Sequence, residues 1–157
     1  LEFRRVLFRS AENFTVRRFG ENGQVKYRLT APYLVHYPDD DTSEVKSPTL
    51  ISYRPDGATV TVTGDQAKVT AKGETIFLWD NVSVTRAATP GRLEMVARMP
   101  DLTAQPDAGI AFTGSPVEIT QGQSWVKGVG IHIDNNNSTL VLQSQVRGQY
   151  IRPRAAP

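Results

Sequence analysis

Residues 64–84, GDQAKVTAKGETIFLWDNVSV, and residues 128–148, GVGIHIDNNNSTLVLQSQVRG, are two copies of one pattern at an offset of 64 residues. Glycine begins both copies, and apolar residues coincide, with Ala67 matching Ile131 and Leu78 matching Leu142. Apolar and polar residues alternate within each segment, which is the period of a strand with one apolar face. Turn-forming residues then interrupt the alternation. Each copy therefore predicts a strand, a turn and a second strand.

The rest of the chain also consists of short strand-like segments between turns rich in proline, glycine and asparagine. Pro32 is expected to bend one segment, and Asp80 and Asn81 to break another. No segment shows helical spacing. Strands are expected at residues 14–19, 25–31, 33–37, 45–53, 58–63, 93–99, 102–104, 110–113, 117–120 and 150–151, besides the two repeats. About a dozen short strands at this spacing predict an all-β sandwich, jelly roll or barrel.

Composition restricts the function classes. The chain has 157 residues, enough for one domain, and it contains no cysteine, which excludes a disulfide scaffold. It has no run of about 18 apolar residues, so no transmembrane helix is predicted. The net charge is +2, but the excess lies in the first ten residues, and positions 11–157 hold 15 basic and 15 acidic residues. Such a balanced body lacks a phosphate-binding stripe and predicts no nucleic-acid partner.

Residues 1–10, LEFRRVLFRS, are interpreted as a foreign leader, because 7–10 (LFRS) are what one frame of a common sequencing adapter, ctcttccgatct, encodes. A signal or anchor that preceded Ala11 would then have been lost. Residues 11–151 are expected to form a single β domain, and residues 152–157 a disordered tail.

The sequence shows no catalytic constellation. His36 and His132 each lie in alternating strand sequence, and Ser115 and Ser124 lack the nucleophile-elbow pattern. The acidic run at residues 38–44 lacks the regular ligand spacing and the glycine of a calcium loop. We therefore predict no enzyme activity, no metal and no cofactor. What remains is the apolar face of the strands, which is either an ordinary core or the lining of a cradle for an apolar ligand.

Three features in order resemble one protein family. They are Leu29-Thr30-Ala31, then residues 36–44 (HYPDDDTSE) followed by Pro48, then the Gly64-x-x-Ala67 unit that ends Ile76-x-Leu78-x-x-Asn81-Val82-x-Val84. Together they resemble the periplasmic domain of the LptC family of lipopolysaccharide export proteins. The similarity extends from about residue 14 to residue 151.

This resemblance implies a fold and a function. The fold would be an open, twisted β-jelly roll of two packed antiparallel sheets, and its interior would carry acyl chains of lipopolysaccharide. Family members are held at the periplasmic face of the inner membrane by an N-terminal helix, which is absent from this chain. They would receive lipid from the inner-membrane extractor complex, whose LptF and LptG jelly rolls face the N-terminal strands. They would pass it to an LptA-like bridge protein through the C-terminal edge strand.

The resemblance also implies roles for individual residues. Period two shows which residues share a face but not which face points inward, so the lipid-binding set is an expectation only: Leu29, Val62, Ala67, Val69, Ile76, Leu78, Val82, Val84, Ile131, Ile133, Leu140 and Leu142. The partner interface is expected at Gly114, in a turn between two late strands, and at Val146, Arg147 and Tyr150 in the closing strand.

Two alternatives stay open from the sequence. The first is a structural or adhesive β-sandwich whose apolar face is a closed core. The second is a carbohydrate-binding module, which would present aromatic residues in a row, for which Phe77, Trp79 and Trp125 are the candidates. Phe77 and Trp79 share the face opposite Ile76 and Leu78, which the sequence does not explain, and we expect burial against a second sheet rather than sugar stacking.

Overall fold

The computed structural model describes residues 9–54 and 57–153, and these form eleven β-strands and one 3-10 turn. The predicted all-β jelly roll is confirmed, and within the described ranges no helix is long and apolar enough to cross a membrane. The elements are β1 (Arg9–Phe19), β2 (Val25–Tyr37), β3 (Thr42–Lys46), β4 (Thr49–Tyr53), β5 (Thr59–Thr63), β6 (Gln66–Val69), η1 (Ala71–Gly73), β7 (Ile76–Arg86), β8 (Met95–Gln105), β9 (Ile110–Gln121), β10 (Ser124–Asp134) and β11 (Thr139–Gln149).

The expected leader and tail fall largely on residues 1–8 and 154–157, which lie outside the described residues. Strand β1 nevertheless begins at Arg9, two residues inside the segment interpreted as foreign.

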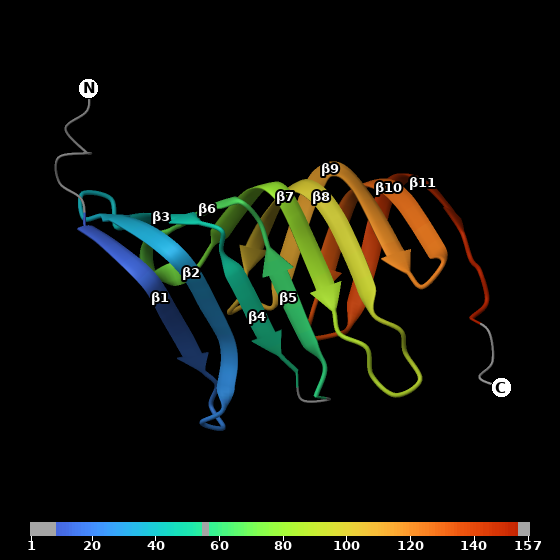
Figure 1. Cartoon of the computed structure of the whole chain (residues 1–157), viewed down its shortest axis with the longest axis horizontal. Coiled ribbons are helices and arrows are strands. Elements are labelled where there is room, and N and C mark those ends of the chain that lie inside the picture. Colours follow the sequence, from blue (N-terminus) through green and yellow to red (C-terminus); the bar gives the residue numbers. More distant parts are fainter. Residues whose placement is uncertain (1–8, 55–56, 154–157) are drawn as a thin grey trace.

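The two expected sheets are two layers of one continuous hydrogen-bonded sheet. Its strand order is β11-β10-β9-β8-β7-β5-β4-β2-β3-β6, with β1 added to β2 and with β6 also paired to β7. The first part of β7 pairs with β6 and its last part pairs with β5, so this strand passes from one layer into the other. Strand β2 does the same between β4 and β3. We call the layer with β4 and β5 layer A, and the layer with β3 and β6 layer B; Figure 1 shows the long strands arching from one to the other.

A crease runs along the sheet where the strands change layer. Asp80 (φ 64°) and Asn81 (φ 54°) form a bulge in β7, and Gly130 (φ 83°) and Gln145 (φ 52°) lie at register shifts in β10 and β11. An extra residue with positive φ bends its strand and increases the local twist. The predicted break at Asp80 and Asn81 is therefore a bend inside one strand.

Several predicted strand boundaries were wrong, because long strands bend at the crease without ending there. Residues 95–99 and 102–104 belong to the single strand β8, which begins two residues later than predicted, and segments 110–113 and 117–120 belong to the single strand β9. Residues 33–37 continue β2 beyond Pro32, in agreement with the expected bend there, because the strand exchanges β4 for β3 at this point and no ladder partner requires the missing N–H. Conversely, segment 45–53 is two strands, because Ser47 (φ 49°) and the buried Pro48 turn the chain between β3 and β4.

The sequence repeat is confirmed as two hairpins in the same register. Ala67 pairs with Leu78 in the β6–β7 hairpin, and Ile131 pairs with Leu142 in the β10–β11 hairpin. The bulge residues Asn81 and Gln145 also differ by the repeat offset. Equivalent positions nevertheless differ in burial, because β7 has a neighbour on both sides whereas β11 is the edge of the sheet.

Candidate functional site: the apolar cavity between the layers

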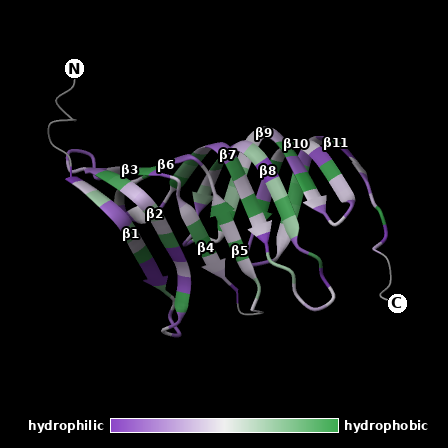
Figure 2. Ribbon diagram, viewed as in Figure 1, coloured by the Kyte–Doolittle hydropathy of each residue, from purple (hydrophilic) through white to green (hydrophobic). Residues whose placement is uncertain are grey.

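A cavity of about 1230 Å³ lies between the two layers, on the side away from the crease. Layer A lines it with Leu50, Val60, Val62 and Val84, and layer B with apolar residues that include Ala104 and Ile133. Its rim reaches exposed residues of the β1–β2 turn, such as Glu21 and Asn22, so the cavity opens to solvent. Side chains of alternate residues along each strand form this lining, and Figure 2 shows the matching alternation of hydrophobic and hydrophilic bands.

All twelve residues of the expected lipid-binding set lie in one apolar cluster. Eight of them are fully buried, and Val69, Ile133, Leu140 and Leu142 are partly buried against the others. Three members, Val62, Val84 and Ile133, line the cavity itself. The set omitted further members of the cluster: Phe14, Tyr27, Ala31, Leu34, Val45, Leu50, Val60, Met95, Ala97, Met99, Leu102, Ala104, Ala111, Val117 and Ile119.

A polar cluster crosses the mouth of the cavity from layer A to the β8–β9 turn of layer B. The Arg18 guanidinium donates through Nε to Oδ1 of Asp107 at 3.2 Å and through a terminal nitrogen to Oδ2 at 2.8 Å. The Lys26 ammonium donates to the Asp107 carbonyl at 2.8 Å, and the Tyr27 hydroxyl donates to Oδ1 at 3.4 Å. We call these four residues the Asp107 cluster. Farther along the mouth, the guanidinium of Arg54 donates to the hydroxyl of Ser138.

Two groups of the Asp107 cluster have perturbed acidities. The hydrogen bond to Asp107 raises the pKa of Arg18, so the guanidinium is firmly charged. Burial of the ring, above all, raises the pKa of Tyr27, and the phenol therefore stays protonated and acts as a donor. The Arg18–Asp107 pair itself is about half exposed.

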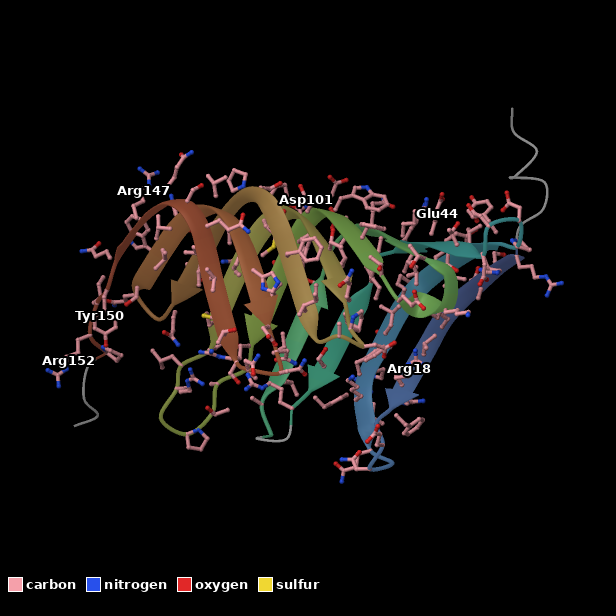
Figure 3. All side chains as sticks on the ribbon, turned by 180° about the vertical axis from the view of Figure 1, so that it is seen from behind. Arg18, Glu44, Asp101, Arg147, Tyr150 and Arg152 are labelled. Carbon is pink, nitrogen blue, oxygen red and sulfur yellow. The ribbon has the colours of Figure 1, made fainter. Side chains whose placement is uncertain are left out.

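Both lateral edges of the sheet are open in the described part of the chain. Strand β1 pairs only with β2, strand β11 pairs only with β10, and the two lie at opposite ends of the molecule (Figure 1). On β11 and just after it, Val146 is 55% exposed and Tyr150 is 78% exposed, and Figure 3 shows Arg147 and Tyr150 at this end. Gly114 is not with them: it lies inside β9, between β8 and β10, and the turn expected there does not exist.

The outer face of layer B carries exposed aromatic residues. Phe77 and Trp79 are 42% and 39% exposed, so the expectation that they are buried against a second sheet was wrong. The described strands form two layers, and the second covers the opposite face of β7. Phe112 and His132, on the neighbouring strands β9 and β10, stack with ring centroids 6.3 Å apart on the same outer face. Trp125 is instead beside Lys127, at the layer A end of β10.

Two polar residues elsewhere, Asp101 and His36, have structural partners. Asp101 on β8 accepts hydrogen bonds from the hydroxyls of Thr113 and Ser115 on the neighbouring strand β9. His36 contacts Ser43 and Asp41 beside the β2–β3 turn. In the described ranges, no group of three or more histidine, aspartate and glutamate side chains could hold a metal ion.

The residues of the Asp107 cluster were missed by the sequence analysis. Asp107 follows Pro106 in a turn, and turn chemistry alone accounts for an aspartate there. Its partners Arg18, Lys26 and Tyr27 precede it by 89, 81 and 80 residues, so no local pattern connects them.

Comparison with known proteins agrees with this architecture. The family model described as "Lipopolysaccharide-assembly, LptC-related" matches residues 9–151. A crystal structure of LptH from Pseudomonas aeruginosa, described as the LptA homologous periplasmic component of the lipopolysaccharide transport device, superposes with a TM-score of 0.51. The match covers 96% of this chain and 98% of that one at 10% identity, which supports a common fold. No curated protein matches the sequence.

Proposed function

Since the chain belongs to the LptC-related family of lipopolysaccharide-assembly proteins, we propose that its cavity holds acyl chains of lipopolysaccharide during export. The family and the fold support a role in lipopolysaccharide transport. The observation that carries the finer proposal is the apolar cavity that reaches solvent between the two layers. Burial of each methylene contributes about 0.8 kcal/mol, so an apolar trough binds acyl chains without further chemistry. A closed-core sandwich would have no such cavity.

The two ends of the sheet support a direction of transfer. We propose that the end with β1 and β2 faces the LptF and LptG jelly rolls of the inner-membrane extractor. The β11 edge would then face an LptA-like bridge protein. A strand added to either edge would continue the sheet through main-chain hydrogen bonds, and thereby extend the trough into the neighbouring molecule. The protein would act at the periplasmic face of the inner membrane.

A charge placed in the cavity tests this function. Val60 and Thr61 are neighbours on β5 with similar partial burial, but only Val60 lines the cavity. We expect Val60→Arg to lower the affinity for labelled lipopolysaccharide at least about tenfold, because acyl chains would have to pack against a desolvated guanidinium. Thr61→Arg should bind like the wild type.

Circular dichroism and the thermal midpoint check that both variants are folded. If Val60→Arg does not fold, Val60→Gln replaces it in the binding measurement. Unchanged binding by the folded cavity variant, or an equal loss in both variants, would contradict the proposed function.

A further inference from the structure

The Asp107 cluster has the geometry of an anion site that is occupied by a side chain of the protein itself. Four hydrogen bonds from three side chains, Arg18, Lys26 and Tyr27, converge on Asp107. All three donors belong to β1 and β2, whereas the acceptor belongs to a turn on the other layer. The turn lies 80 to 89 residues later in the chain. Figure 3 shows Arg18 near the end of β1.

The charged residues that line the cavity include more cations than anions, which favours binding of a more highly charged anion. The described charged residues that line the cavity are Arg18, Lys26 and Arg54 against Glu21 and Asp107. Of the two cations in the cluster, Arg18 contacts the carboxylate, and Lys26 contacts the neutral carbonyl of the same residue. An ion pair as exposed as Arg18–Asp107 contributes little to stability, so a competing anion can displace it.

We infer that the Asp107 cluster is a binding site for a phosphate-type anion on a lipid headgroup, with Arg18 and Lys26 as its ligands and Asp107 as the internal competitor. This inference rests on the proposed function, because the four residues of the site line the cavity that would hold the acyl chains. A phosphate carries more charge than a carboxylate and has three acceptor oxygens. Arginine binds it through two parallel hydrogen bonds, and lysine binds it as a point charge.

Binding would also change the mouth. The contacts of the Asp107 cluster tie layer A to the β8–β9 turn, whose residues line the cavity. When a headgroup takes the place of the Asp107 carboxylate, the salt bridge between the layers is broken at the moment the lipid arrives.

The test compares two lipids and four single variants in the full chain. The lipids are labelled lipopolysaccharide and the same lipid after enzymatic removal of its phosphates, with inorganic phosphate as a competitor. Arg18→Gln and Lys26→Gln remove the proposed ligands, and Asp107→Asn removes the competitor. Arg17→Gln is the matched control, since Arg17 is the neighbouring residue on β1 and does not line the cavity.

We expect Arg18→Gln and Lys26→Gln each to weaken binding of the phosphorylated lipid about tenfold, the effect of losing one charge-assisted hydrogen bond. Asp107→Asn should strengthen it severalfold, and Arg17→Gln should change nothing. None of the four should change binding of the dephosphorylated lipid. These opposite changes in affinity are diagnostic. If the Arg18–Asp107 salt bridge served only to stabilise the fold, the loss of either residue would weaken lipid binding.

Three results would overturn the inference. They are weaker binding by Asp107→Asn, equal losses for both lipids, and inorganic phosphate that binds as tightly as the phosphorylated lipid. In each of these cases wild-type binding of the dephosphorylated lipid would leave the proposed function standing. If neither lipid binds the wild-type protein, the proposed function and the anion site both fail.

Discussion

Leu78 and Leu142 occupy the same position in the two copies of the repeat, and each pairs with an apolar residue of its hairpin partner. Leu78 is only 2% exposed, because β7 is flanked on both sides and covered by the other layer. Leu142 is partly buried, because β11 has no neighbour beyond it among the described strands. Burial at a given residue therefore depends on where its copy of the repeat lies in the sheet.

This difference predicts unequal costs for one substitution. Leu78→Ala should lower the free energy of unfolding by about 2–5 kcal/mol, as is usual when a buried leucine leaves a cavity. Leu142→Ala should cost less than about half as much, since its site is partly solvated and can relax. Urea denaturation of the two variants and the wild type measures both values. Equal losses would contradict the burial of β11 as described.

At the scale of elements, alternation predicted nearly all strands and the shared face of the twelve apolar residues. It did not predict that the strands of β8 and β9 run on through Pro100, Pro116 and Gly114, because a bulge and a turn contain the same residue types. Edge position was equally hidden, since it depends on pairing between distant strands. Gly114 is expected in the interface with Val146 only from the family resemblance, and the strand order does not bring them together, because β10 separates the strand of Gly114 from β11.

Surface substitutions on the two open edges should each weaken binding of a different partner. Val16 on β1 and Val146 on β11 are each about half exposed, so an aspartate at either position should change stability by no more than about 0.5 kcal/mol. We expect Val146→Asp, combined with Tyr150→Ala, to reduce binding of an LptA-like bridge protein about tenfold or more. Val16→Asp should leave that binding unchanged and weaken binding to the extractor complex.

Surface plasmon resonance with each partner measures the four combinations. If both edges affect the same partner, or neither affects any, the assignment of one partner to each end is wrong.

At the scale of the whole molecule, the architecture follows from one sheet that folds on itself along a crease of bulges. The apolar face is enclosed between the layers, the outer face carries Phe77 and Trp79, and the mouth opposite the crease is crossed by the Asp107 cluster. Composition and period two were sufficient to predict the all-β class. The mouth could not be predicted, because it is assembled from β1, β2 and a turn about 80 residues later in the chain.

The central claim is that lipid chains occupy the space between the layers, and neighbouring residues on β10 test it most directly. Ile133 lines the cavity, whereas His132 lies on the outer face of the same strand. A photo-crosslinking side chain is placed at each position in turn, and the protein is irradiated with labelled lipopolysaccharide. We predict a strong lipid adduct from position 133 and little or none from position 132. Equal adducts from both positions, or an adduct from position 132 alone, would contradict the account.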